Sequence, residues 1–140
     1  MEIATALDFA KMTRNSVLTA IKRDGRPQLS NVSHAVGEDG LIRISITTDR
    51  AKYKNLLRGP WAALHVARAD FWAYVVLEGD VTLSDVASSP DDAVVEELIA
   101  LYRAIGGEHP DWDEYRRAMV ADHRVVVRIK PTYAYGMLPE

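Results

Sequence analysis

A short polar stretch in the first half of the chain carries the side chains best suited to binding a charged group. Ser45 and Thr47 supply hydroxyls near the end of a predicted strand, and Arg50 and Lys52 follow in the first turn of a predicted helix. That turn has free backbone N–H groups, which favour an anion, whereas cations there oppose the helix dipole. A bound phosphate would explain the cations, and both hydroxyls would lie on the same side of the strand. The alternative is a solvated surface helix with an ordinary run of charges.

No group of residues has the spacing of a catalytic or metal site. The histidines are scattered along the chain, at His34, His65, His109 and His123. They form no HExxH-type motif. His34 follows Ser33, but neighbours on a strand face opposite sides, so these two residues are not expected to form a serine–histidine pair. The acids between residues 91 and 97 are typical of the solvated face of a capped helix. We therefore predict no catalytic residue and no metal ligand.

Composition excludes several classes of protein. The chain has 140 residues, of which 48% are hydrophobic and 26% charged, and this predicts a single globular domain over residues 1–140. The lack of cysteine excludes disulfides, thiolate metal sites and thiol nucleophiles, and it suits a reducing cytoplasm. The net charge of −3 gives no sign of a nucleic-acid or anionic-membrane partner. No apolar run reaches the ~18 residues of a membrane span, so we expect a cytoplasmic protein.

The first half of the chain is predicted to form a helix followed by strands. Apolar residues at helical spacing predict a helix over residues 2–14. The period changes to two from Ser16, and Asp24-Gly25 is a strong hairpin signal before a returning strand from Pro27 to Val36. Another strand is predicted from Leu41 to Ile46, with its isoleucines on one face. Together these segments predict a three-stranded antiparallel meander.

The second half mixes helices with strands. Its predicted segments are a helix over 50–58, strands over 62–67 and 71–84, helices over 89–106 and 111–121, and a strand over 124–130. Thr48 or Asp49 is expected to cap the first helix, and Ser89 with Pro90 to start the second. Asp111 with Glu114 offers a capping box for the third. The long strand is expected to bend near Glu78-Gly79-Asp80.

Strands outnumber helices, and the two do not alternate regularly, which argues against a doubly wound parallel sheet. A small barrel or strongly curled antiparallel sheet with peripheral helices would remove most exposed strand edges. The expected fold is therefore mainly β, with six or so antiparallel strands and short helices at the periphery.

An ordered set of motifs runs through the chain. It consists of Gly25-Arg26-Pro27-Gln28-Leu29-Ser30-Asn31-Val32, then Arg50-Ala51-Lys52, then Asn55-Leu56, and later Gly107-Glu108-His109-Pro110-Asp111-Trp112. The set resembles the pyridoxamine-5′-phosphate-oxidase-like family of split β-barrels. More narrowly, it is similar to the actinobacterial branch of that family, which uses the deazaflavin coenzyme F420. The resemblance extends from about Val17 to Gly136.

The resemblance implies a split β-barrel that works as a homodimer, with the coenzyme in a groove between the two barrels. Arg50 and Lys52 would bind the coenzyme phosphate, assisted by the Ser45 hydroxyl and by Asn55. The full set of implied coenzyme-binding residues is Gln28, Leu29, Ser30, Asn31, Ser45, Thr47, Arg50, Ala51, Lys52, Asn55, Trp72 and Tyr74.

The ring system of the coenzyme would lie along residues 28–31. Trp72 and Tyr74, two apart on one predicted strand face, would reach in from the partner subunit. They could equally be ordinary core or interface aromatics. Two residues depart from the family pattern, because Trp61 stands where relatives often carry arginine and Tyr53 replaces a smaller polar residue. Both departures would reshape the rim of the pocket.

The implied activity is an oxidoreduction in which reduced F420 passes a hydride to a conjugated organic substrate, while the protein binds, orients and excludes water. Two alternatives share the fold. One is an FMN-binding oxidase or reductase, including chemistry of the pyridoxamine-phosphate type. The other is a non-catalytic protein that carries the coenzyme. Yellow protein with bound FMN would favour the first, and tight binding without turnover would favour the second.

Overall fold

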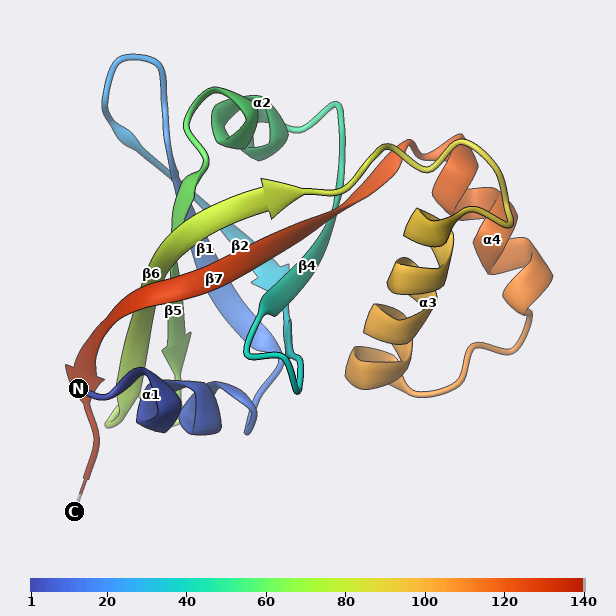
Figure 1. Cartoon of the computed structure of the whole chain (residues 1–140). Coiled ribbons are helices and arrows are strands. Elements are labelled where there is room, and N and C mark those ends of the chain that lie inside the picture. The colour runs from blue at the N-terminus through green and yellow to red at the C-terminus, as the bar shows by residue number, and fades with distance from the viewer. Residues whose placement is uncertain (140) are drawn as a thin grey trace.

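The computed structural model describes residues 1–139, which form a curled antiparallel sheet with short helices around it (Figure 1). The strands are β1 (Asn15–Ile21), β2 (Pro27–Ser33), β3 (Ala35–Val36), β4 (Ile42–Thr47), β5 (Trp61–Ala67), β6 (Tyr74–Leu83) and β7 (Arg124–Met137). The helices are α1 (Ile3–Ala10), α2 (Ala51–Arg58), α3 (Ala93–Gly106) and α4 (Trp112–Ala121). The strand order is β2-β1-β5-β6-β7-β4-β3. The predicted mainly β fold with peripheral helices is confirmed.

The main core lies on the inner face of the curled sheet. Alternate residues of each strand point into it, as the period-two pattern predicts. Ile42, Ile44 and Ile46 of β4 are almost completely buried there, together with Leu18 of β1 and Leu64 of β5. Each such side chain stabilises the fold by about 1.5–3 kcal/mol. The opposite face of the same strands packs against other elements or is exposed to solvent.

The chain itself forces the sheet to curl. β2 ends at Ser33 and β3 begins at Ala35, yet these two strands lie at opposite ends of the strand order. Only one residue, His34, separates them, so the two edges of the sheet must approach each other. His34 is buried at this seam, with 1% of its surface exposed. The predicted single strand from Pro27 to Val36 is therefore interrupted where the barrel closes.

The predicted meander is wrong in its third strand. β1 and β2 do form the predicted hairpin around Asp24-Gly25, with Ile21 opposite Pro27. β4, however, pairs with β7 in register from Ile42 opposite Ile129 to Thr47 opposite Arg124. Alternation in a sequence specifies which face of a strand is buried and leaves its neighbour open, so the partner of β4 could not be identified from periodicity.

The long strand β6 bends where the sequence predicted. Its register against β7 shifts between Glu78 and Gly79. A Cβ atom on Gly79 would lie 2.1 Å from the carbonyl oxygen of Lys130, so only glycine allows this approach of the two strands. Beyond the shift, β7 continues through Pro131 to Met137, which makes it longer than the predicted strand over residues 124–130.

α1 and α2 lie at opposite ends of the curled sheet (Figure 1). α1 is shorter than predicted and packs through Ala6 and Ala10, which are fully buried in the main core. α2 begins after Arg50, so the prediction that Thr48 or Asp49 caps this helix is wrong. The Asp49 carboxylate instead accepts from the Thr47 hydroxyl. The first turn of α2 therefore keeps its backbone donors free of a side-chain cap.

α3 and α4 form a hairpin that packs on the outer side of β4 and β7, where Val126 joins a second apolar cluster. α3 is capped by Asp92, not by Ser89 as predicted. The Asp92 carboxylate accepts from the backbone N–H of Val95 and also from that of Ser89, which moves the helix start by three residues. Asp111 caps α4 by accepting from the N–H of Glu114, as predicted.

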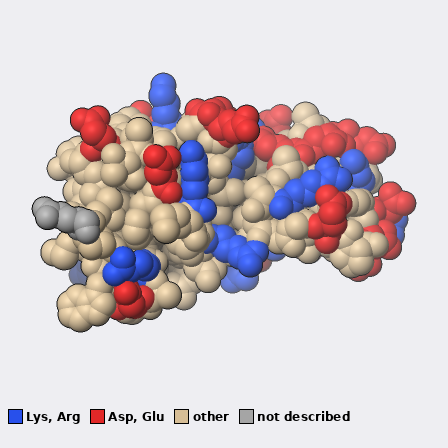
Figure 2. All heavy atoms as spheres, turned by 90° about the horizontal axis from the view of Figure 1, so that it is seen from below, with Lys and Arg blue, Asp and Glu red and all other residues tan. Residues whose placement is uncertain are grey.

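Glu97 fastens the α3–α4 hairpin to the barrel. Its carboxylate accepts from Arg128 of β7 at 2.6 and 2.8 Å and from Arg43 of β4 at 2.9 Å. Arg43 also pairs with Asp39 at 2.7 Å. In the view from the α1 side, charged side chains crowd over the α3–α4 end of the molecule, whereas the barrel end is mostly uncharged (Figure 2).

Candidate functional site

The first turn of α2 gathers the residues predicted to bind an anion. Ser45 and Thr47 are half-buried on one face of β4, which runs into the turn before the helix. Arg50 is the exposed residue at the helix start, and Lys52 is half-buried one residue into the helix. Burial, Arg50 and Arg124 together lower the pKa of Lys52. The structure therefore brings these predicted residues together in an electropositive cluster.

Arg124 is a member of this cluster that the sequence did not single out. It begins β7 directly opposite Thr47, and its Nη1 lies 3.5 Å from the hydroxyl and the carbonyl oxygen of Ser45. Its Nε is buried and has no hydrogen-bond partner among residues 1–139. No local pattern could reveal it, because its position depends on the pairing of β4 with β7. We call Arg50, Lys52 and Arg124, with Ser45, the cation cluster.

Thr47 and Asn55 are held by other protein groups. The Thr47 hydroxyl donates its hydrogen to the Asp49 carboxylate, so that hydrogen is not free to bind a ligand. Asn55 is buried, donates through its amide to the Gln28 side-chain oxygen at 3.3 Å, and accepts from Arg58 at 2.7 Å. This link ties α2 to β2. Asn55 thus contributes to the position of the cation cluster through α2.

The predicted β2 residues divide between the two faces of the sheet. Gln28 and Ser30 point inward, and the Ser30 hydroxyl oxygen is buried without a hydrogen-bond partner among residues 1–139. Leu29 and Asn31 point outward, and 60% of the Leu29 surface is exposed. Strand alternation requires this split, so a ligand lying on one face meets only half of the predicted stretch.

The outer face of the barrel holds two pockets. One has a volume of about 510 Å³ and contains Leu29, Trp61 and Tyr135, and the other has a volume of about 730 Å³ and contains Asn31. His65 and Val17 line both pockets. Neither pocket contains a residue of the cation cluster. Trp61, one of the two departures from the expected pattern, therefore shapes a pocket, whereas Tyr53 packs against the main core.

The prediction that Trp72 and Tyr74 share one strand face is wrong. β6 begins at Tyr74, which lies opposite Ala67 and stacks on the His65 ring with centroids 5.3 Å apart. Trp72 lies in the preceding turn, where its backbone N–H donates to the Asp70 carboxylate, and 78% of its surface is exposed. The Asp70 contact turns the chain before the strand starts, so Trp72 stands at the edge of the outer face.

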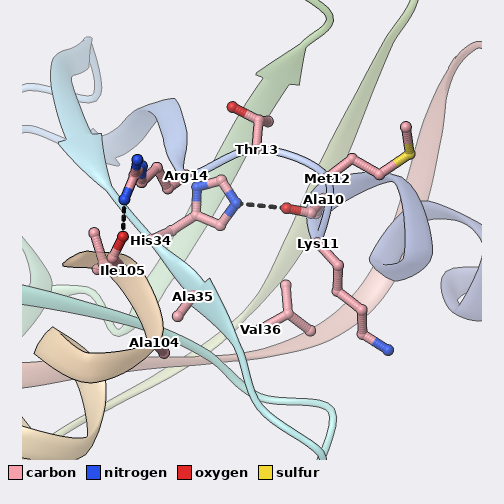
Figure 3. Close-up of a pocket in the computed structure, with 10 residues that line it drawn as sticks. All are labelled: Ala10, Lys11, Met12, Thr13, Arg14, His34, Ala35, Val36, Ala104 and Ile105. Atoms are coloured by element: carbon pink, nitrogen blue, oxygen red, sulfur yellow. Dashed lines mark hydrogen bonds between the residues drawn. The ribbon is translucent and has the colours of Figure 1, made fainter. Parts of the chain in front are cut away.

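The structure contains a serine–histidine pair that the sequence did not predict. His34 Nδ1 lies 2.7 Å from the Ser16 hydroxyl oxygen. On the other side of the ring, His34 Nε2 lies 2.9 Å from the Ala10 carbonyl oxygen (Figure 3). A pocket of about 370 Å³ lies beside the ring, and Arg14 donates there to the carbonyl oxygen of Ile105 (Figure 3). None of the predicted coenzyme-binding residues lines this pocket.

Among residues 1–139, no three or more His, Asp or Glu side chains are grouped so that they could hold a metal ion. Over the same residues, no helix has both the length and the apolar character that crossing a membrane would require.

Several solved structures are similar to this chain. An F420 reductase is 25% identical, with a TM-score of 0.67 and 91% of this chain and 94% of that chain covered. A conserved hypothetical protein from Mycobacterium tuberculosis is 23% identical, with a TM-score of 0.74 and coverage of 100% and 90%. A pyridoxamine 5′-phosphate oxidase-related, FMN-binding protein from Nostoc punctiforme is 19% identical, with a TM-score of 0.62 and coverage of 96% and 81%. The last two likenesses establish the fold alone.

The family model described as pyridoxamine 5′-phosphate oxidase matches residues 4–138. This match spans all the strands from β1 to β7, the cation cluster and the α3–α4 hairpin. The curled antiparallel sheet, with its edges drawn together at His34, is the split β-barrel expected from the sequence motifs. This chain is a member of the pyridoxamine 5′-phosphate oxidase family.

Proposed function

We propose that this protein is a cytoplasmic oxidoreductase that binds a flavin-type coenzyme as a homodimer, with F420 preferred to FMN. The observation that carries the proposal is the convergence of Arg50, Lys52 and Arg124 beside the Ser45 hydroxyl. No ion pair joins any of these cations to a carboxylate within residues 1–139. A phosphate would supply the missing negative charge, and the uncapped first turn of α2 adds backbone donors for its oxygens.

The preference for F420 rests on sequence similarity. The ordered motifs resemble the F420-using branch. The F420 reductase named above is 25% identical to this chain and covers 91% of it. The FMN-binding protein shares 19% identity and therefore supports the fold without deciding the coenzyme. When bound, either coenzyme would supply the redox chemistry, while the residues of this chain bind it, orient it and exclude water.

The barrel supports this role by fixing the cation cluster on rigid elements. Ser45 belongs to the β4–β7 ladder, Lys52 to α2, and the Gln28–Asn55 hydrogen bond holds α2 against β2. These observations fit an anionic coenzyme whose phosphate is anchored at α2 and whose ring lies along β2.

A second copy of the chain would complete the site. The outer face exposes Leu29, Tyr133, Tyr135 and Met137 at 41–63% of their surface, with Trp72 at its edge. A monomer rarely leaves such a continuous apolar face in water. The pockets on this face lie apart from the cation cluster of the same chain. Pairing two barrels through this face would cover the apolar surface and enclose the coenzyme ring between subunits.

The direct test is a fluorescence titration of the purified protein with F420 and, separately, with FMN. Micromolar or tighter binding of F420, with much weaker binding of FMN, is the expected result. Tighter binding of FMN would assign the chain to the flavin-using members of the family. Binding of neither coenzyme would overturn the proposal.

Turnover separates an enzyme from a coenzyme carrier. Protein loaded with reduced F420 should reduce at least one member of a panel of quinones, enones and tetrapyrroles, measured as return of the oxidised-coenzyme absorbance. The same panel without protein measures the background rate. Tight binding together with no turnover above background on the whole panel would leave coenzyme carriage as the function.

A further inference from the structure

Within residues 1–139, the half-buried guanidinium of Arg124 forms no ion pair with an acid. Its Nε is buried and unpaired among residues 1–139, and its Nη1 donates to the two Ser45 oxygens only at 3.5 Å, the outer limit of a hydrogen bond. Arg128, four residues along the same strand face, shows the contrast, because it donates to both oxygens of Glu97 at 2.6 and 2.8 Å. The protein thus neutralises one of these two arginines and leaves the other without an acid.

The surroundings of Arg124 make the partial burial of its charge more unfavourable. Lys52 and Arg50 bring further positive charge to the same place, and the charge of Arg124 contributes to the lowered pKa of Lys52. On the α4 side, Arg124 lies close to Tyr115, whose pKa burial raises to about 12, so this phenol is neutral and supplies no counter-charge. A partly desolvated cation among like charges is unfavourable unless an anion joins it.

The number of cations indicates the charge of the ligand. One negative charge on a phosphate could be met by Lys52 and the backbone donors of α2. Arg50 and Arg124 then remain; Arg50 is exposed, whereas Arg124 is half-buried and fixed on β7 opposite Thr47. A guanidinium held on a strand presents a rigid, planar donor fork, which suits a phosphate or carboxylate oxygen pair.

We propose that Arg124 binds a second negative charge at the phosphate end of the coenzyme and thereby favours coenzymes that carry one. This inference rests on the proposed function. The second charge has two possible sources of the same chemistry. In FMN it is the second ionisation of a terminal phosphate, and in F420 it is a carboxylate attached beyond a phosphodiester.

The test compares Arg124→Met and Arg124→Lys with Arg117→Met, a matched control that removes an exposed arginine from α4. Affinities are measured for F420, for FMN and for their phosphate-free counterparts, the deazariboflavin of F420 and riboflavin. Arg124→Met should weaken at least one phosphate-bearing coenzyme by about tenfold or more and leave the phosphate-free compounds unchanged. Arg124→Lys should recover part of the loss, and Arg117→Met should bind as the wild type does.

If Arg124→Met lost affinity for FMN alone, the second charge would lie on the phosphate. If it lost affinity for F420 alone, the second charge would lie on the carboxylate tail. Wild-type affinity of Arg124→Met for both coenzymes would overturn the inference while the proposed function stands. An equal loss for the phosphate-free compounds would also overturn it, since the effect would then come from the ring site.

Inorganic phosphate makes the two failures distinguishable. Millimolar phosphate should raise the melting temperature of the wild type and of Arg117→Met, and raise that of Arg124→Met less. If the wild type bound neither coenzyme but showed this pattern, the anion role of Arg124 would survive and the proposed function would fall. An equal phosphate shift in all three proteins would overturn the role of Arg124.

Discussion

The Ser16 hydroxyl and the His34 imidazole are joined by a buried hydrogen bond of 2.7 Å at the seam where the barrel closes. On the other side of the ring, Nε2 contacts the Ala10 carbonyl oxygen at 2.9 Å. Because a carbonyl oxygen can only accept, Nε2 carries the proton and Nδ1 accepts from Ser16. The neutral ring therefore ties β1 and the end of α1 to the junction of β2 and β3.

This arrangement makes stability depend on pH. Burial lowers the pKa of His34, although the bond to Ala10 opposes the shift, so the unfolded chain binds a proton more readily than the folded protein. The free energy of unfolding should be highest above pH ~6.5, the ordinary pKa of histidine, and fall as the pH is lowered below it, by up to about 1.4 kcal/mol per pH unit. Urea unfolding between neutral and mildly acid pH measures this slope.

His34→Gln should lower stability at neutral pH and flatten the slope, since glutamine does not titrate. His123→Gln, which removes an exposed histidine, is the control and should keep the wild-type slope. The explanation fails if His34→Gln and the wild type lose stability in parallel as the pH falls.

Glu97 should be important for the α3–α4 hairpin. Its half-buried carboxylate is shared by Arg43 and Arg128, so Glu97→Gln would leave two guanidiniums without their common acid. We expect a loss of about 1–3 kcal/mol in the free energy of unfolding. Glu96→Gln is the matched control, because the adjacent Glu96 is exposed and its one ion pair within residues 1–139 is with Arg116 at 2.7 Å. It should cost less than ~1 kcal/mol. Equal effects in the two variants would contradict the role of Glu97.

Much of the fold could be predicted from local signals. The Asp24-Gly25 hairpin, the bend at Glu78-Gly79 and the Asp111 cap all depend on residues close together in the sequence. The pairing of β4 with β7 could not be predicted, since it joins residues about eighty positions apart and alternation alone does not name a partner. The start of α3 at Asp92 was missed because Ser89 and Asp92 both offer acceptable caps, and the structure uses the carboxylate.

In the candidate site too, residues marked by a local signal could be predicted, and residues placed by long-range contacts could not. Arg50 and Lys52 stand out in the sequence because cations at a helix start oppose the helix dipole, and the structure places both at the start of α2. Arg124 could not be identified because its position depends on the pairing of β4 with β7. The Ser16–His34 contact joins β1 to the residue that follows β2, and a comparison of sequence neighbours does not show it. Trp72 was placed on a strand because spacing alone cannot show the turn that Asp70 holds.

Lys52 should matter for binding and not for folding. Lys52→Ala should weaken the binding free energy of the coenzyme by about 1.5–3 kcal/mol, the value of a lost charged hydrogen bond. It also removes repulsion with Arg50 and Arg124, so the ligand-free protein should lose no more than ~0.5 kcal/mol of stability. Lys54→Ala, which removes an exposed lysine of the same helix, is the control for both measurements. Unchanged affinity of Lys52→Ala would remove the phosphate from this site.

The outer face of the barrel should hold two copies of the chain together. Tyr135 lies in this face, 41% exposed and lining the pocket of about 510 Å³ that also contains Leu29 and Trp61. Light scattering coupled to size exclusion should give twice the chain mass for the wild type. Tyr135→Glu would place a carboxylate from each copy in an apolar interface, where an unpaired charge costs several kcal/mol, and should give a folded monomer.

Two controls make the result specific to this face. Met12→Glu adds the same charge at a methionine that is 77% exposed and outside the face, so it should remain dimeric. Circular dichroism should show that Tyr135→Glu keeps its strands, because the substituted side chain points away from the main core. If the coenzyme ring lies between the two subunits, the monomeric variant should also bind the coenzyme more weakly while phosphate binding at the cation cluster persists. A wild type that is monomeric at every concentration would contradict both the interface and the shared site.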